Sequence, residues 1–154
     1  MGKLYVVRHA DAGSRGHASK PDEDRELSER GWRQAEALSD VLADLGITRL
    51  LTSPFVRCVQ TLEPLANAIG LPVETDERLS EGAGAKGARA VAAEVCDTAA
   101  VLCSHGDVIP DLLEQLVAHG IKLKGGLRWQ KASTWVLTCE DGHITKGRYL
   151  PPPS

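Results

Sequence analysis

Long hydrophobic runs are missing from this sequence of 154 residues: no apolar stretch approaches the ~20 residues that a membrane-spanning helix needs. The chain passes from Met-Gly-Lys directly into a short strand-like run, without the apolar core of a signal peptide. The four cysteines are widely scattered, at Cys58, Cys96, Cys103 and Cys139. They form neither a Cys-x-x-Cys pair nor the cysteine and histidine pairing of tetrahedral zinc sites. We therefore expect a cytoplasmic protein with no membrane contact, whose cysteines are reduced and mostly buried.

A strong charge of either sign is also missing. The formal net charge of −3 argues against a general nucleic-acid or anionic-membrane binder, although a local basic pocket can exist within that balance. Hydrophobic residues make up 42% and charged residues 25%, near the globular average, which excludes a disordered or fibrous chain. The sequence shows no repeat or linker, so we expect a single domain over residues 1–150 and a frayed tail over residues 151–154.

Apolar runs too short for helices alternate with amphipathic helical patterns along the chain. The predicted strands cover residues 4–7, 47–52, 73–75, 100–103, 133–139 and 144–150. The predicted helices cover residues 29–45, 54–69, 88–96 and 109–119. This alternation predicts a three-layer α/β domain with a mainly parallel sheet and an antiparallel edge formed by the last hairpin.

The helix boundaries carry local signals. Ser28 is placed to cap the first helix, and Gly46 is placed to end it. Ser53-Pro54 supplies a cap and a first-turn proline for the second helix, which ends before Gly70. Residues 78–87, RLSEGAGAKG, are predicted to be a loop because of their glycines.

Basic and imidazole side chains follow three of the predicted strands. Arg8 and His9 come directly after the first strand, Arg57 falls in the first turn of the second helix, and His105 follows the fourth strand. In parallel sheets, ligands bind at the carboxyl ends of the strands, where these residues would meet. Guanidinium groups and helix N-termini bind phosphate oxygens, and a neutral histidine can attack phosphorus. Each residue alone is a weak signal, but together they predict a phosphate site with a histidine nucleophile.

Three segments, in this order, resemble the signature segments of the histidine phosphatase superfamily: LYVVRHADAG, LLTSPFVRCVQTLEPLA and VLCSHGDVIPDLL. A fourth segment, LSERGWRQAEAL, resembles the first helix of that family. The resemblance implies a phosphoglycerate mutase-like fold in which His9 attacks the phosphoryl group and becomes transiently phosphorylated. It also implies that Arg8, Arg57 and His105 bind the equatorial phosphoryl oxygens, and we expect no metal or other cofactor to be needed.

Three carboxylates are candidates for the proton donor. Glu81 lies where many family members carry their acidic proton donor, so the resemblance makes it the candidate acid. Asp107 and Asp11 are competing carboxylates close to the signature segments. Ser14 and Arg15, in the loop that follows the first strand, are candidates for further phosphate contacts.

Two residues depart from the family pattern. Ala10 stands where the signature usually has glycine, and Ala12 stands where many members have serine or threonine. The methyl group of Ala10 strains the loop if the backbone there has a positive φ.

Two resemblances bear on the substrate class, and the first, which implies protein phosphohistidine, is the favoured one. The short chain looks like the small bacterial phosphohistidine phosphatases of the SixA type, which implies a phosphorylated protein as the partner. The segments SPFVRCVQTLEPLA, VIPDL and STWVL are similar to the histidine phosphatase domain that is fused to Nudix hydrolases, which implies a nucleotide or small phosphorylated metabolite. Basic residues of two loops are candidates to line a polyphosphate or nucleotide site: Arg15, Lys20, Arg25, Lys122, Lys124, Arg128 and Lys131.

Three further hypotheses concern the same region. Trp129 either stacks on a base or anchors its loop against the core, and the second role is the commoner one. A binding module that recognises phosphorylated partners without turnover is a different class of function, and the complete set of charged candidates argues against it. Mutase activity requires a closed pocket that excludes water, and no segment is long enough to form a lid.

Overall fold

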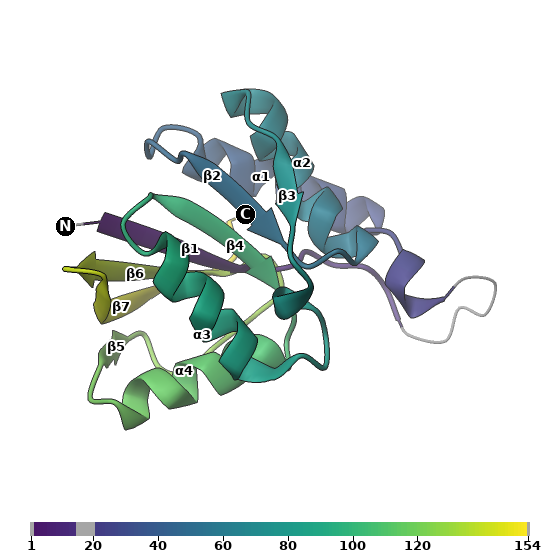
Figure 1. The fold of residues 1–154 in the computed structure, drawn as a ribbon. Helices are drawn as coiled ribbons and strands as arrows, with labels where there is room; N and C mark the ends of the chain where they lie inside the picture. Colours follow the sequence, from purple (N-terminus) through teal and green to yellow (C-terminus); the bar gives the residue numbers. More distant parts are fainter. Residues whose placement is uncertain (1, 15–20, 154) are drawn as a thin grey trace.

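The central sheet contains seven strands in the described part of the chain, in the order β3-β2-β4-β1-β6-β7-β5 (Figure 1). This computed structural model describes residues 2–14 and 21–153. The strands are β1 (Gly2–Arg8), β2 (Arg49–Thr52), β3 (Val73–Thr75), β4 (Ala100–Ser104), β5 (Lys122–Lys124), β6 (Thr134–Glu140) and β7 (His143–Leu150). Among them only β6 runs against the others, because its pairings with β1 and β7 are the antiparallel ones. The prediction of a mainly parallel sheet is confirmed.

Two pairs of helices cover the two faces of this sheet. The helices are α1 (Glu29–Leu42), α2 (Val56–Ile69), α3 (Gly84–Val95) and α4 (Val108–Ala118), with two short 3-10 turns, η1 (Asp22–Asp24) and η2 (Glu77–Leu79). Alternation along β1 places Leu4 and Val6 in the core with α3 and α4, and Tyr5 and Val7 in the core with α1 and α2. Figure 1 shows the two pairs on opposite sides of the sheet. The predicted three-layer α/β fold is confirmed.

The first helix begins as predicted but ends earlier. Ser28 Oγ accepts a hydrogen bond from Gly31 N at 3.0 Å, so it caps α1. The helix ends at Leu42, three residues before the predicted end. Leu45 is 43% exposed, so its apolar side chain does not belong to the buried stripe that holds the helix on the sheet.

The start of the second helix differs from the prediction. It begins at Val56, and the residue before it, Phe55, makes no side-chain capping bond. Ser53 Oγ accepts from Phe55 N at 3.3 Å and lies 2.8 Å from His105 Nε2. Ser53 therefore joins the entry of α2 to the end of β4 instead of capping the helix. Gly70 ends α2 in the left-handed conformation, as predicted.

Two elements in the second half of the chain were not predicted correctly. Helix α3 begins at Gly84, inside the segment 78–87 that its glycines marked as a loop. The sequence predicts a basic loop where strand β5 forms, because Lys-Leu-Lys is only three residues long and contains a single apolar residue. It becomes a strand by pairing with β7 at the edge of the sheet.

The last hairpin and the tail also differ in position from the prediction. Asp141 and Gly142 form the predicted turn between β6 and β7, with φ values of 52° and 78°. The hairpin lies inside the sheet and not at its edge, because β5 adds beyond β7. Pro152 and Pro153 are partly buried and line a surface pocket together with Arg30 of α1, where a frayed tail was expected.

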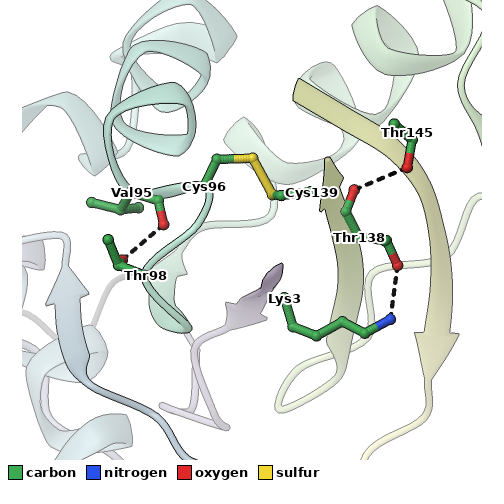
Figure 2. Close-up of a disulfide and its surroundings, with 7 residues drawn as sticks. All are labelled: Lys3, Val95, Cys96, Thr98, Thr138, Cys139 and Thr145. Atoms are coloured by element: carbon green, nitrogen blue, oxygen red, sulfur yellow. Dashed lines mark hydrogen bonds between the residues drawn. A yellow bond between two sulfur atoms is a disulfide. The ribbon is translucent and has the colours of Figure 1, made fainter. Parts of the chain in front are cut away.

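A disulfide joins Cys96, directly after α3, to Cys139 in β6 (Figure 2). The prediction that all four cysteines are reduced is wrong for this pair. The two residues are 43 positions apart, and only the packing of α3 against the sheet brings them together. Cys58 and Cys103 are free and buried, as expected. Within residues 2–14 and 21–153, no helix is long and apolar enough to cross a membrane.

Candidate active site

The parallel strands β1 and β4 bring the two signature histidines together. Arg8 is opposite Ser104 in the register of the two strands, so His9 and His105 leave the sheet side by side. The backbone N–H of His9 donates to Ser104 O at 3.1 Å, and the two imidazole centroids lie 5.5 Å apart. Arg57 joins them from the first turn of α2, which follows β2. The four residues predicted to form the phosphate site therefore lie at one edge of the sheet.

His9 is held as a neutral imidazole. Its side chain is buried, and Nδ1 lies 2.7 Å from Ala10 O, which can only accept, so Nδ1 carries the proton in this bond. Burial lowers the pKa of His9 to about 3, and the positive charge of Arg57 contributes to the decrease. The ring therefore stays neutral at neutral pH, with its lone pair on Nε2.

The backbone around the histidine is fixed by short bonds. Ala10 N donates to Thr61 Oγ1 at 2.9 Å, and Thr61 Oγ1 donates to Arg57 O at 2.7 Å. Ala10 is fully buried and is absent from the non-glycine residues with positive φ, so its methyl group causes no backbone strain. Ala12 is also buried and adds no hydroxyl to the site.

Arg57 is almost completely buried, with 1% of its surface exposed. Its Nη1 donates to Asp22 O at 2.8 Å and its Nη2 to Asp22 Oδ2 at 3.1 Å. The same Nη2 lies 3.6 Å from Glu81 Oε1. The guanidinium carbon lies 5.0 Å from the ring centroid of Phe55, which supports the buried charge from one side.

Arg8 and His105 are positioned by equally specific contacts. Arg8 Nη1 donates to Trp129 O at 2.9 Å. His105 Nε2 lies 2.8 Å from Ser53 Oγ and 3.5 Å from Cys58 Sγ. Both side chains therefore keep one nitrogen in the protein's own hydrogen-bond network and leave another for a ligand.

Three buried nitrogens of this group have no hydrogen-bond partner among the described residues: Arg8 Nε, Arg57 Nε and His105 Nδ1. A buried polar atom without a partner costs about 1–3 kcal/mol, so such atoms are rare unless they serve a ligand. All three belong to side chains predicted to bind phosphoryl oxygens, and N–H groups of this kind suit an oxyanion.

A cavity of about 350 Å³ opens beside these groups. It is lined by Arg8, His9, Gly13, Arg25, Arg57, Glu81, Gly106, Asp107 and Lys131. Ser14 is exposed and does not line this cavity, so the structure does not place it as a phosphate contact. Arg15, the other residue suggested for this role, lies outside the described residues, as does Lys20.

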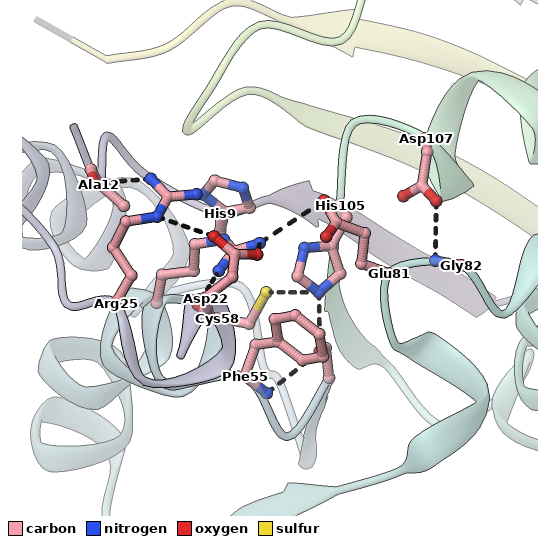
Figure 3. A network of polar contacts seen from close by, with 12 residues as sticks. His9, Ala12, Asp22, Arg25, Phe55, Cys58, Glu81, Gly82, His105 and Asp107 are labelled. Atoms are coloured by element: carbon pink, nitrogen blue, oxygen red, sulfur yellow. Dashed lines mark hydrogen bonds and ion pairs between the residues drawn. The ribbon is translucent and has the colours of Figure 1, made fainter. Parts of the chain in front are cut away.

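The three candidate proton donors are placed differently. Glu81 and Asp107 both line the cavity, and Asp107 Oδ2 accepts from Gly82 N at 2.8 Å (Figure 3). Asp11 does not line the cavity itself; it accepts from Ser28 Oγ at 2.6 Å and pairs at 3.3 Å with Lys131, which does line it. The hydrogen bond from Ser28 lowers the pKa of Asp11, and because Asp11 does not line the cavity it is not placed to protonate a leaving group there.

The basic loop residues divide into two groups. Arg25 and Lys131 line the cavity, as the polyphosphate hypothesis required. Lys122 and Lys124 lie in β5 and line a different pocket, so their assignment to this site was wrong. Arg128 does not reach it either, because its guanidinium stacks 4.5 Å from the ring centroid of Tyr149. Trp129 packs against the core beneath α3 and α4, which confirms its anchoring role.

Asp22 is the residue of this site that sequence reasoning missed. Its carboxylate also accepts from Arg25 Nε at 3.1 Å, so it bridges the two arginines (Figure 3). Burial alone would raise the pKa of Asp22, but the charges of Arg57 and Arg25 lower it overall. The stretch PDEDR carries no signal for this role beyond a run of charge, because Asp22 and Arg57 are 35 positions apart.

Comparison with known proteins agrees with this geometry. Residues 4–86 match the family model described as the histidine phosphatase superfamily, branch 1. The chain belongs to the histidine phosphatase superfamily. It is 37% identical over 155 residues to an 8-oxo-(d)GTP phosphatase of Mycolicibacterium smegmatis, an alignment that covers 97% of this chain and 48% of that protein. The chain thus spans about half the length of that curated relative.

Solved structures of the superfamily share the fold. A protein histidine phosphatase SixA in complex with tungstate superimposes with a TM-score of 0.76 at 20% identity, covering 99% of this chain and 96% of that one. A mycobacterial glucosyl-3-phosphoglycerate phosphatase superimposes with a TM-score of 0.72 at 21% identity, covering both chains completely. The fold and the superfamily expected from the signature segments are confirmed.

Proposed function

We propose that this chain is a phosphatase that works through a phosphorylated His9. The observation that carries the proposal is a set of three buried nitrogens beside a neutral histidine: Arg8 Nε, Arg57 Nε and His105 Nδ1, none of which has a hydrogen-bond partner within residues 2–14 and 21–153. Donors arranged in this way stabilise the charge that develops on the phosphoryl oxygens in the transition state.

The reaction has two displacements at phosphorus. In the first, the lone pair of His9 Nε2 forms a bond to phosphorus while the bond to the leaving group breaks and the leaving group receives a proton from a cavity carboxyl. In the second, water attacks the phosphohistidine and gives a proton to the carboxylate that the first step left behind, the N–P bond breaks, its electron pair returns to Nε2, and phosphate is released. The hydrogen bond from Nδ1 to Ala10 O keeps Nε2 available in both steps.

In the proposed reaction, arginine side chains neutralise the charge on the phosphoryl group. A guanidinium is a permanent cation in proteins, so Arg8 and Arg57 supply two fixed positive charges without a metal ion. Hydrolysis of nitrophenyl phosphate by the full chain should therefore survive a chelator, while His9→Asn should abolish it. Loss of turnover with a chelator and its recovery with magnesium would contradict this part of the proposal.

Glu81 is the acid we propose for the first step. Its Oε1 lies 3.6 Å from Arg57 Nη2, next to the position a phosphoryl oxygen would take. Asp107 lines the same cavity, but its Oδ2 accepts from the loop amide of Gly82. That bond favours a role for Asp107 in holding the loop that carries Glu81.

The substrate we propose is a nucleotide or similar small phosphorylated molecule. The sequence alone favours a protein phosphohistidine as the substrate. The 37% sequence identity to an 8-oxo-(d)GTP phosphatase supports the nucleotide class instead. Arg25 and Lys131 also line the cavity, where they are held by Asp22 at 3.1 Å and by Asp11 at 3.3 Å, and their donors can extend contact to a second phosphate. A protein phosphohistidine remains the second candidate, because imidazole leaves readily and requires little help from an acid.

Competition kinetics separates the two substrate classes. A phosphorylated histidine-containing carrier protein and a series of nucleoside di- and triphosphates would be compared by kcat/KM, with Lys131→Gln as a matched variant. The nucleotide class predicts the higher kcat/KM for nucleotides and a drop in Lys131→Gln that is confined to them. A higher value for the carrier protein, unchanged in this variant, would assign the phosphohistidine class.

A further inference from the structure

Five basic side chains share a hollow on the sheet at the opposite end of β1 from the active site. The hollow has a volume of about 480 Å³, and its basic lining residues are Lys3, Lys122, Lys124, Lys146 and Arg148. Lys3 precedes Arg8 by five residues along β1, which corresponds to roughly 17 Å of extended strand. The hollow is therefore separate from the cavity around His9.

The register of four strands explains why these cations gather. Residues directly opposite each other in neighbouring strands project from the same face. One row across β1, β6, β7 and β5 is Lys3, Thr138, Lys146 and Lys122. The next row is Tyr5, Val136, Arg148 and Lys124. Neighbouring strands are ~4.8 Å apart, so the rows place the basic side chains within reach of one small ligand.

The basic side chains of this hollow are exposed, and two threonines beside them are hydrogen-bonded. Lys3 Nζ donates to Thr138 Oγ1 at 2.8 Å, and Thr145 Oγ1 lies 3.4 Å from Thr138 O (Figure 2). Both threonines line the hollow. Lys122, Lys124, Lys146 and Arg148 are exposed, and within residues 2–14 and 21–153 none of these four is paired with a carboxylate.

This arrangement costs stability in the absence of an anion. Lys122 is directly opposite Lys146, and Lys124 is directly opposite Arg148, and like charges in such positions destabilise a sheet. Lysines on an edge strand protect it from pairing with other chains, which explains those of β5. That role does not explain Lys146 and Arg148, because β7 is an interior strand. A chain with a net charge of −3 has no general excess of cations to distribute.

We propose that this hollow binds a compact oligophosphate, either an inorganic polyphosphate or the phosphate chain of a nucleotide. Its concave shape and size suit a small molecule, and lysine, arginine and threonine groups are phosphate ligands. Single-stranded nucleic acid is disfavoured because the lining offers no exposed aromatic side chain for base stacking. An acidic protein is disfavoured because the lining has no large exposed apolar anchor.

The test is an amide NMR titration of the full chain in a His9→Ala background, which prevents turnover of the probe. Sodium tripolyphosphate is the first probe and adenosine triphosphate the second; a hexaglutamate peptide and a single-stranded oligonucleotide form two further arms. A pocket variant, Lys122→Gln/Lys146→Gln/Arg148→Gln, removes three charges from the hollow. A control variant, Arg30→Gln/Arg33→Gln/Lys86→Gln, removes three exposed charges from α1 and α3.

The proposal predicts saturable shifts of the amides in β5 and β7 with tripolyphosphate. The affinity should fall about tenfold or more in the pocket variant and stay unchanged in the control variant. Equal affinity for adenosine triphosphate assigns recognition to the phosphate chain, and tighter binding by about tenfold assigns a nucleotide. Shifts that do not saturate, equal loss in both variants, or tighter binding of the peptide or the oligonucleotide would overturn the proposal.

Discussion

The guanidinium of Arg8 lies against the backbone of Gly106, so close that a Cβ atom at this position would be 2.6 Å from Arg8 Nη2. Gly106 directly follows His105, so one residue without a side chain lets the arginine from β1 approach the histidine from β4. The contact couples two of the proposed phosphate-binding groups. It also explains why a glycine stands between His105 and Asp107 in the chain.

Gly106→Ala should therefore displace the Arg8 guanidinium and lower kcat/KM for nitrophenyl phosphate by about a hundredfold, the scale of losing one transition-state donor. A double-mutant cycle with Arg8→Ala identifies the cause. If the clash with Arg8 is responsible, Gly106→Ala should have little further effect once Arg8 is absent. Additive losses would show that Gly106 matters for another reason.

The proton donor can be assigned with two isosteric variants. Glu81→Gln should slow alkyl phosphates by about a hundredfold or more, because alkoxide leaving groups need a proton, and should slow nitrophenyl phosphate far less. Asp107→Asn should slow both substrates to a similar and smaller extent, since its carboxylate holds the Gly82 amide. Equal slowing of both substrates by Glu81→Gln would rule out the acid role.

Burial of His9 makes stability depend on pH. Its pKa is about 3 in the folded chain and 6.5 in the reference state, so between these values the unfolded chain binds a proton that the folded chain does not. The free energy of unfolding is therefore highest above about pH 6.5 and falls as the pH decreases toward 3. At about pH 5 the loss from His9 is ~2 kcal/mol.

Chemical denaturation at about pH 7.5 and about pH 5 measures this effect, with His9→Asn as the control. The wild type should lose ~2 kcal/mol more than the variant over this interval, because asparagine does not titrate. Identical losses would show that His9 titrates near its usual pKa in the folded chain, and would remove the basis for a permanently neutral nucleophile.

The ends of β1 and β4 were predictable from sequence because the apolar run of β1 stops directly at Arg8 and that of β4 stops one residue before His105. Parallel pairing of β1 and β4 then fixes where His9 and His105 meet. Asp22 was not predictable, because its contact with Arg57 depends on how the segment before α1 folds back. The basic hollow was missed for a similar reason: it requires the register of β5, a three-residue strand with no apolar pattern.

The disulfide between Cys96 and Cys139 gives a prediction for stability. It closes a long loop, so reduction should lower the free energy of unfolding by about 2–4 kcal/mol. Thiol titration in denaturant should find only Cys58 and Cys103 reactive in the oxidised chain. A Cys96→Ser/Cys139→Ser variant should be insensitive to reductant. Four reactive thiols in the untreated chain would contradict the bond.

The phosphorylated histidine is the central claim, and trapping it is the most direct test. The full chain would be mixed rapidly with labelled phosphate donors, nucleotide and protein, and quenched without acid. Wild type should form a base-stable, acid-labile phosphoryl adduct that His9→Asn cannot form, and the amount formed with each donor ranks the substrate classes. Phosphate binding without an adduct from any donor would contradict the account and indicate a module that binds phosphorylated partners without turnover.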